Sequence, residues 1–214
     1  MVTVKETSNI NRDKTVLSIY GDFHIHTIYS ADSIIQPKTL VDMLAAHKFI
    51  KVAAVTDHDS VRGCNATIEL ASAYPDILII PGVEISTPQG DMLVLGTDEL
   101  PPKPWMPEDV VDYAKSIGAV SIVAHPFREY GMGDLARNYK VDAIEVLNGG
   151  SSVSANSQAK ELAKSMGLSG TAGSDAHQVS ELFSVNAKID ANLNVESVLK
   201  AIKKGFVSAH LTKG

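Results

Sequence analysis

The sequence predicts an α/β fold, and within that class a β/α barrel whose functional site lies at the C-terminal ends of the strands. Short continuous apolar runs alternate with amphipathic segments of helical period, which is typical of a parallel sheet covered by helices. Polar residues follow five or six of these runs, at the face where barrels build active sites. An open doubly wound sheet would gather such groups at one crevice, and no Gly-rich phosphate loop follows any strand, so we favour the barrel.

The apolar runs predict the strands, because a strand that is buried on both faces shows no polar alternation. The third run leads into Pro81-Gly82-Val83-Glu84, which we expect to end that strand. We expect strands at residues 16–25, 52–55, 77–80, 92–95, 120–123, 143–147 and 168–172, and a final short strand at 206–209.

The segments between the strands predict the helices. Pro37 is suited to open the first helix, in which Leu40, Val41, Leu44 and Ala45 share one face. Three later helices end before a glycine, which is a common helix stop. We expect a helix from Pro37, a short helix around 67–73, and helices over 108–117 before Gly118, 157–166 before Gly167 and 195–204 before Gly205.

Length and composition predict one globular domain over residues 1–214, with a polar leader at 1–15 and the barrel over 16–210. Hydrophobic residues make up 44% and charged residues 21% of the chain, as in ordinary globular proteins. The net charge is −6 and no Lys/Arg-rich run occurs, which argues against long duplex nucleic acid as a partner. A small phosphorylated molecule remains compatible with this charge.

Cysteine content and hydropathy predict a cytoplasmic location. The single cysteine, Cys64, cannot form an internal disulfide, which fits a reducing compartment. Residues 1–15 lack the apolar core of a signal peptide, and no run approaches eighteen apolar residues. We therefore expect no membrane partner; the oligomeric state is left open.

A pair of histidines at the end of the first predicted strand is the strongest sign of chemistry. Strand alternation places His24 and His26 on one face and Phe23 and Ile25 on the other. A single histidine in a strand is usually a satisfied polar group, but two at this spacing, with Asp32 nearby, predict metal ligands.

The other predicted strand ends carry the same kinds of side chain. Five of the seven histidines fall at strand ends, together with acidic residues. Imidazole and carboxylate without thiolate suit zinc, manganese or iron, and the number of donors predicts two or three divalent ions. The strand-end groups are His24 and His26, Asp57 and His58, Glu84, His125, and Asp175 and His177.

Taken together, these strand ends resemble the successive motifs of the PHP (polymerase and histidinol phosphatase) superfamily, in the same order, over about residues 20 to 180. The resemblance implies a distorted (β/α)7 barrel with up to three metal ions and, for stand-alone members, phosphoesterase activity. The matching motifs are His24-Ile25-His26, Thr56-Asp57-His58-Asp59, Gly82-Val83-Glu84, Ala124-His125-Pro126 and Ser174-Asp175-Ala176-His177.

The resemblance also implies how the ligands are shared among the ions. His24, His26, Glu84 and Asp175 would hold one ion. A second ion would be held by Asp32, His58 and His177. Glu84 would bridge to a third ion, which His125 also binds.

Asp91 marks a departure from the family pattern. Many members place a histidine on the strand after the Gly-x-Glu motif, where this chain has Asp91-Met92-Leu93. A carboxylate is a competent ligand, so Asp91 either replaces that histidine at the third ion or is an exposed loop carboxylate with a weak or empty site beside it.

Several residues near the motifs have two interpretations. Arg128 is placed to bind a phosphate by a forked contact, or it is a surface arginine. Asp22 and Asp57 are expected to orient ligand imidazoles rather than to bind metal.

Other residues carry less weight. Glu145 and Asn148 end a strand, where they touch substrate or support the ligands. Arg62 is either a second phosphate contact or a helix-start surface residue, Cys64 is expected to be buried and unreactive, and the segment 129–138 is either a flap over the site or an ordinary connection.

The predicted reaction is hydrolysis of a phosphoester in a small phosphorylated metabolite or nucleotide, by a hydroxide that bridges two metals. Arg128 and the metals would neutralise the phosphoryl oxygens, and His177 or Asp175 would relay protons.

Two alternatives remain. A metal-dependent amidohydrolase also begins with a His-x-His pair, but it usually adds a metal-bridging lysine, and no lysine ends a strand here. A non-catalytic metal-binding accessory domain would need the same ligands without turnover.

Overall fold

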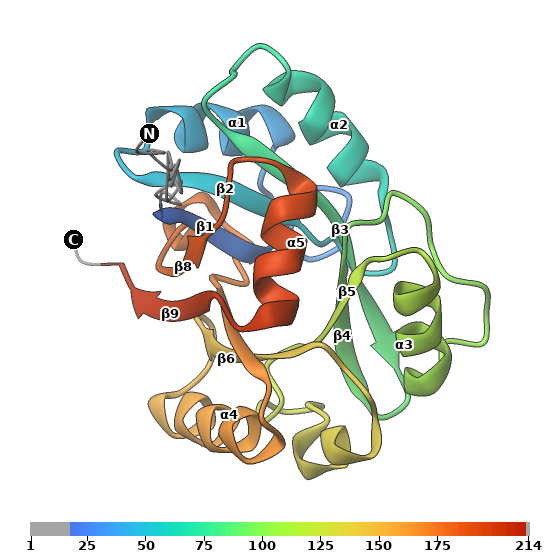
Figure 1. Cartoon of the computed structure of the whole chain (residues 1–214). Helices are drawn as coiled ribbons and strands as arrows, with labels where there is room; N and C mark the ends of the chain where they lie inside the picture. The colour runs from blue at the N-terminus through green and yellow to red at the C-terminus, as the bar shows by residue number, and fades with distance from the viewer. Residues whose placement is uncertain (1–17, 213–214) are drawn as a thin grey trace, which may run out of the picture.

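A computed structural model describes residues 18–212 (Figure 1). The predicted leader at 1–15 and the first two residues of the strand predicted at 16–25 lie outside the described residues. The strands are β1 Ser18–Ile25, β2 Ile50–Val55, β3 Leu78–Thr87, β4 Gly90–Leu95, β5 Val120–Val123, β6 Ala143–Asn148, β7 Ser169–Gly173, β8 Val185–Asp190 and β9 Val207–Leu211. The helices are α1 Pro37–Ala46, α2 Arg62–Ala71, α3 Pro107–Ser116, α4 Val153–Met166 and α5 Val195–Lys204, with short 3₁₀ helices η1 Gly133–Asn138 and η2 Val179–Glu181.

Within the described residues the strands form one sheet in the order β7-β6-β5-β4-β3-β2-β1-β8-β9. The chain that follows β7 returns to β1, where Asp175 N donates to His24 O at 2.7 Å and His26 N donates to Ala176 O at 3.1 Å. These bonds join the two halves of the sheet into a nearly closed barrel. α1 to α4 lie around its outside, and α5 packs against the apolar interior (Figure 1). The predicted barrel is therefore confirmed, although the sheet has more strands than the seven implied by the family resemblance.

The sheet is mixed rather than wholly parallel, and here the sequence prediction was wrong. β4 runs antiparallel to both β3 and β5, and β8 runs antiparallel to β1. Only two residues separate β3 from β4, and so short a connection can join only antiparallel strands.

β3 extends past the end predicted for it. Its first half pairs in parallel with β2 and its second half pairs with β4, so that Glu84 lies opposite Leu93 in the middle of the strand. Glu84 therefore lies within the strand and not at its end, where the sequence predicted it.

Helix ends follow capping chemistry. α5 matches its predicted range, with the Asn194 side chain accepting from Ser197 N and with Gly205 at φ 77°. α4 begins at Val153, four residues before the predicted start, because Ser152 caps it by accepting from Ala155 N. α2 begins at Arg62, earlier than the predicted 67, and so covers the residues that follow the Thr-Asp-His-Asp motif.

The barrel interior is apolar except at the end that carries the histidines. Phe23, Ile80 and Leu93 are fully buried in the apolar part, and Val198 and Ile202 of α5 belong to the same cluster. No helix in residues 18–212 is long and apolar enough to cross a membrane.

Cys64 is fully buried on α2, as predicted. Burial raises the pKa of its thiol to about 11, so the reactive thiolate is scarce below that pH. We expect the native protein not to react with dithionitrobenzoate at pH 8, and the unfolded protein in guanidinium to release one equivalent of thionitrobenzoate. Fast labelling of the native protein would contradict this burial.

Candidate metal centre

Two histidines at the end of β1 point into the barrel. His24 and His26 are fully buried, and their Nε2 atoms lie 3.0 Å apart. β7 can approach β1 this closely because Gly173 faces His24: a Cβ at Gly173 would lie 2.2 Å from the His24 Cβ. Two ring nitrogens aimed at one point are suited to share a cation.

The structure brings all nine predicted ligands together. They form three groups of donor atoms, within each of which the atoms lie within 4.8 Å of one another, and each group could hold a metal ion. The groups are His24, His26, Glu84 and Asp175; His26, Asp32, His58 and His177; and Glu84, Asp91 and His125.

The first group is buried. Glu84 Oε2 lies 3.0 Å from His24 Nε2 and 3.1 Å from His26 Nε2, and Asp175 Oδ1 lies 3.1 Å from His26 Nε2. The group thus consists of two carboxylates and two imidazoles whose donor atoms converge on one point.

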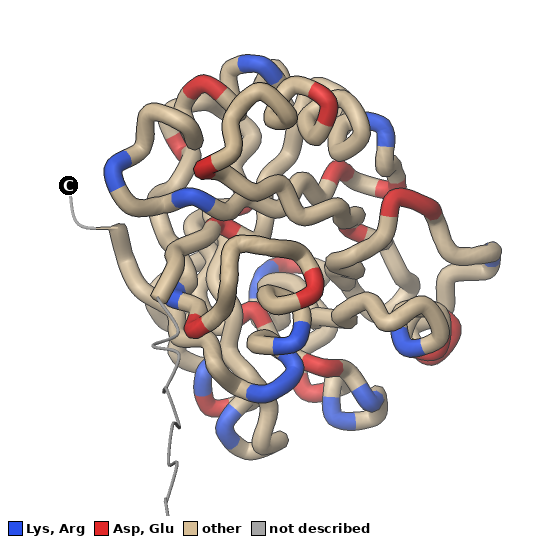
Figure 2. Tube along the Cα trace, turned by 45° about the horizontal axis from the view of Figure 1, so that its top comes forward, with Lys and Arg blue, Asp and Glu red and all other residues tan. Residues whose placement is uncertain are grey.

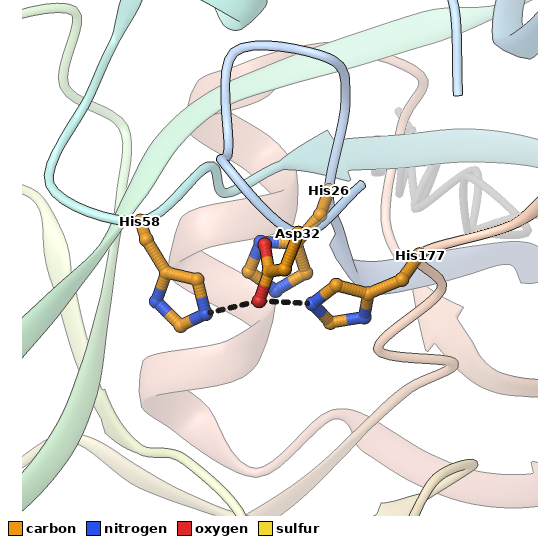
Figure 3. Close-up of side chains that lie close together, drawn as sticks. All are labelled: His26, Asp32, His58 and His177. Atoms are coloured by element: carbon orange, nitrogen blue, oxygen red, sulfur yellow. Dashed lines mark ion pairs between the residues drawn. The ribbon is translucent and has the colours of Figure 1, made fainter. Parts of the chain in front are cut away.

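The second group is open to solvent. Figure 3 shows the Asp32 carboxylate between the rings of His58 and His177, with His26 beside it. Asp32 Oδ2 lies 3.2 Å from His177 Nε2 and 3.7 Å from His58 Nε2. The Asp32 side chain is 54% exposed. His26 belongs to this group as well as to the first, which the sequence did not predict.

The third group depends on Glu84 as a bridge. Its Oε1 lies 3.0 Å from His125 Nε2, while its Oε2 faces the first group. Asp91 reaches this group from β4, where it pairs with Ser86 of β3. Burial raises the pKa of Asp91, and the charge of Glu84 raises it further. The structure thus places Asp91 among the donors rather than on an exposed loop.

The outer ring nitrogens support the assignment of these rings as metal ligands. His24 Nδ1 donates to Glu145 Oε1 at 3.0 Å, and His177 Nδ1 donates to the Asp175 backbone oxygen at 2.8 Å. Ligating histidines usually donate their second N–H to an oxygen in this way, which leaves Nε2 free for the metal. The donor set therefore fits divalent ions.

Ser30 supplies the corresponding partner for His26. The Ser30 hydroxyl donates to Asp57 Oδ1 at 3.2 Å and accepts from the His58 backbone N–H at 2.9 Å. Its oxygen lies 3.0 Å from His26 Nδ1. Because the one hydroxyl proton goes to Asp57, the oxygen accepts from His26, and so the His26 Nδ1 carries the proton. Sequence analysis missed Ser30, since a serine in a loop has no pattern that marks it.

Asp57 is held in place by its neighbours. It accepts from the Thr27 backbone N–H at 2.6 Å and from the Thr27 hydroxyl at 2.8 Å. The first turn of α2 packs directly on it: a Cβ at Gly63 would lie 1.9 Å from Asp57 Oδ2. Asp57 thus acts on the His26 ring through Ser30.

Asp22 does not orient an imidazole, contrary to the prediction. It is fully buried and accepts from three backbone N–H groups, those of His24, Ser174 and Phe183. It therefore fixes the backbone where β1, the chain after β7 and the start of β8 meet. Burial raises the pKa of Asp22 to about 7 against the effect of these hydrogen bonds. Glu145, not Asp22, contacts the His24 ring.

Arg128 lies beside the buried group. Its Nη1 forms an ion pair with Asp175 Oδ2, and the Asn148 amide donates to the same oxygen at 3.2 Å. The Arg128 side chain is 38% exposed, and within residues 18–212 its guanidinium forms a hydrogen bond only through Nη1. Arg62 instead lies over the Tyr29 ring, 4.9 Å from its centroid.

The segment 129–138 contains η1 and is packed against the body of the protein. Met132 and Ala136 are buried, and Gly133 N donates to Pro126 O at 2.7 Å. Of the two interpretations, the ordinary connection describes this segment better than a flap.

The metal-free centre retains protons. Burial by itself lowers the pKa of His26, but hydrogen bonds to Asp175 and Glu84 raise it to about 9. Burial likewise lowers the pKa of His24, while the charges of Asp175 and Glu84 raise it well above its usual value. For Glu84, burial raises the pKa, but the charge of His24 and the hydrogen bond from His125 hold it well below its usual value. Near pH 7, the protonated rings of the metal-free protein therefore supply the positive charge that metal ions would otherwise supply to Glu84 and Asp175.

Comparison with known proteins points to one family. A family model described as the PHP domain matches residues 22–165, and one described as PHP-associated matches residues 153–207. An uncharacterized protein of Methanocaldococcus jannaschii is 31% identical over 140 residues, which cover 60% of this chain and 81% of that protein.

Two solved structures share the fold. A two-domain protein from Bacteroides vulgatus, described as containing a predicted PHP-like metal-dependent phosphoesterase, superposes with a TM-score of 0.76 at 20% identity. The match covers 92% of this chain and 66% of that one, just under two thirds of its length. An amidohydrolase from Chromobacterium violaceum, solved with sulfate and no metal, superposes with a TM-score of 0.63 at 18% identity over 75% of this chain and 88% of that one.

The Ser30 hydroxyl should contribute to metal affinity. In Ser30→Ala, His26 loses the acceptor that fixes its tautomer, and we expect metal affinity to fall about tenfold to a hundredfold. Competition with a chelator measures the affinity, and long-range ¹H–¹⁵N spectra of the metal-free protein report the His26 tautomer. Ser33→Ala is the control, because Ser33 Oγ contacts only backbone groups: it lies within hydrogen-bond distance of the His26 and His177 oxygens and accepts from the Ile35 N–H. Equal losses in the two variants would show that Ser30 acts on the loop and not on the ring.

Metal uptake should release protons. The pKa of His26 is raised to about 9, so its proton competes with metal at all lower pH values, and the apparent affinity should rise as the pH increases from 6 to 9. Titration of the metal-free protein with zinc in weak buffer, followed by calorimetry in buffers of different ionisation enthalpy, counts the protons. Binding without proton release at pH 7 would contradict the charge state described here.

Proposed function

The chain belongs to the PHP domain family, and we propose that its metal centre hydrolyses a phosphoester in a small phosphorylated metabolite or nucleotide. The observation that carries this proposal is the set of three adjoining donor groups, which share Glu84 and His26. We assign two or three divalent ions, zinc, manganese or iron, to these groups, because imidazole and carboxylate donors suit those metals. Such ions would activate water and offset the negative charge of a phosphoryl group.

The protein itself contributes binding and orientation. Arg128 uses Nη1 to hold Asp175, and its remaining N–H groups are available to phosphoryl oxygens on the open side of the centre. Asn148 holds the same Asp175 oxygen, so Asp175 Oδ1 stays directed at the first donor group. Arg128 thus has two tasks, to position a ligand and to bind the substrate.

For proton transfer, His177 is better placed than Asp175. Its ring is 25% exposed, with Nε2 3.2 Å from the Asp32 carboxylate, whereas Asp175 is buried and paired with Arg128. The His177 backbone N–H is held by Glu181 Oε2 at 2.9 Å, which fixes where the ring stands. His177 Nε2 can relay a proton toward the leaving group only while it holds no ion; when His177 serves as a ligand, the leaving group would take its proton from water.

The surface supports a small substrate rather than a polymer or a membrane. Figure 2 shows Lys and Arg interspersed with Asp and Glu along the chain, without a basic stripe in that view. With the net charge of −6, this argues against long duplex nucleic acid. We place the protein in the cytoplasm on the basis of its single buried cysteine.

Hydrolysis of an amide is the second candidate, because a structural neighbour is named an amidohydrolase. The lysines of the described residues that form ion pairs are Lys38, with Asp42, and Lys51, with Asp76, and neither contacts a carboxylate of the centre. The metal-bridging lysine common in that class therefore has no counterpart among the described ion pairs of the centre. We therefore prefer the phosphoester, and amide substrates belong in the same panel.

The test combines metal analysis with an assay of phosphomonoesters, phosphodiesters and amides. We expect two or three equivalents of metal and release of phosphate or cleavage of a diester. His24→Ala combined with His26→Ala should remove the metal and lower the rate more than about a hundredfold, since both rings serve the buried group. His210→Ala, which changes an exposed histidine on β9, is the control.

Three results would contradict the proposal. Metal-loaded protein that cleaves no phosphoester in a broad panel would favour an accessory domain. Cleavage of amides alone would favour the amidohydrolase. Full turnover in the double variant would place the activity elsewhere.

A further inference from the structure

A polar pocket of about 420 Å³ opens beside the metal centre. Asp175 and His177 form its inner wall, and Arg128 lies at its edge. A volume of this size holds a small molecule, and a phosphate bound between Arg128 and the second donor group would carry its esterified group into it. The lining of the pocket therefore bears on which esterified group the site accepts.

The side chains that line the pocket are small or polar. No Phe, Tyr, Trp or large aliphatic side chain of the described residues lies in its lining, and its one aromatic ring is the His177 imidazole, which belongs to the second donor group. Ser180 and Ser184 also line it, both are exposed, and neither hydroxyl is hydrogen-bonded to another side chain or backbone group of residues 18–212. An aryl ring would therefore find little apolar surface beyond the His177 ring, whereas ligand hydroxyls would find partners at the two serines.

Gly149 and Gly150 also line the pocket, and their lack of side chains leaves space in it. A Cβ at Gly149 would lie 2.6 Å from Ser184 Oγ, and a Cβ at Gly150 would lie 3.2 Å from Arg128 Nη1. Side chains at these positions would press on the hydroxyl and the guanidinium that the pocket presents. Glycine thus leaves both groups accessible to a ligand.

The charges in the pocket are balanced. Arg128 supplies donors, and the Glu181 carboxylate supplies acceptors. Glu181 Oε2 accepts from the backbone N–H groups of His177 and Gln178, and Oε1 accepts from the Gln178 side-chain amide, which leaves room for one further hydrogen bond at Oε1. A second anionic group would gain from Arg128 but would lie against Glu181. A neutral group with several hydroxyls can pair with both.

We propose that the group esterified to the phosphate is a small polyol or sugar, bound in this pocket through Ser180, Ser184 and Glu181. This inference rests on the proposed function for the position of the phosphate. Ser180 and Ser184 are exposed, so water can bind them in the free protein. An alkyl or aryl group would cover their hydroxyls without replacing those hydrogen bonds, whereas the hydroxyls of a ligand would replace them. Aryl and simple alkyl esters should therefore bind less well than polyol esters of the same size.

The experiment uses unreactive phosphonates, so that binding is measured whether or not hydrolysis occurs. We compare 2,3-dihydroxypropylphosphonate with propylphosphonate, which has the same carbon chain without hydroxyls, and with phenylphosphonate. Calorimetry on the metal-loaded full chain should give a dissociation constant at least about tenfold lower for the dihydroxypropyl compound, as one or two added hydrogen bonds imply.

Ser184→Ala provides the matched variant. It should weaken binding of the dihydroxypropyl compound about fivefold to tenfold and leave propylphosphonate unchanged. Ser116→Ala, on α3 and outside the pocket, is the control and should change neither. In turnover assays the same variant should raise KM for a polyol phosphate and not for propyl phosphate.

Two outcomes would overturn the inference. Propylphosphonate or phenylphosphonate that binds as tightly as the dihydroxypropyl compound would show that the hydroxyls gain nothing. A loss in Ser184→Ala that is equal for all three ligands would show a general disturbance of the site. In either case, hydrolysis of propyl phosphate would leave the proposed function standing, whereas polyol-selective binding without hydrolysis of any ester would sink the proposed function alone.

Discussion

The burial of Glu84 among imidazoles is the interaction on which the rest of the structure depends. Its carboxylate is inaccessible to solvent, and nitrogens of His24, His26 and His125 lie 3.0 to 3.1 Å from its oxygens. An unpaired carboxylate there would cost several kcal/mol, and the neighbouring imidazoles offset it. In the metal-free protein the offsetting charges are protons on the rings, which hold the pKa of Glu84 well below its usual value, and in a metal-loaded protein they would be the ions. The two states therefore differ in which cation offsets Glu84 and Asp175, and the same ring positions serve both.

The closure of the barrel between β1 and the chain after β7 brings the ligand side chains together. β1 and the chain after β7 exchange backbone hydrogen bonds beside His24 and His26, and Gly173 removes the side chain that would otherwise separate the strands. Asp22 accepts three backbone N–H groups at the same junction. The backbone hydrogen bonds at this junction and the Asp22 carboxylate therefore hold the strands in the positions that bring the charged donors together. α5 packs among apolar residues of the barrel interior, which remain free of charge.

Local pattern could predict the strands, the helices and the ligand residues, but not their mutual contacts. The residue types at the ends of predicted strands selected seven of the nine donors, whereas Asp32 and Asp91 were assigned as ligands through the resemblance to the PHP family. β8 was missed, although its sequence Val185-Asn186-Ala187-Lys188-Ile189-Asp190 alternates apolar and polar residues, because continuous apolar runs were taken as the sign of a strand. The roles of Ser30, Glu145 and Arg128 arise from contacts between segments far apart in the chain, and no local pattern encodes those.

The donor groups differ in exposure, so the centre has a buried side and a side that is open to solvent. The first group is sealed by the barrel, while Asp32, His58 and His177 of the second group are open to solvent at 54%, 34% and 25%. A substrate can approach only from the open side, where Arg128 and the polar pocket also lie. An ion in the first group would therefore act mainly by holding Glu84 and Asp175 in place, and an ion in the second group would be the one that a phosphoryl oxygen of the proposed substrate could reach. His26 is buried and belongs to both groups, so its ring would link the two ion sites.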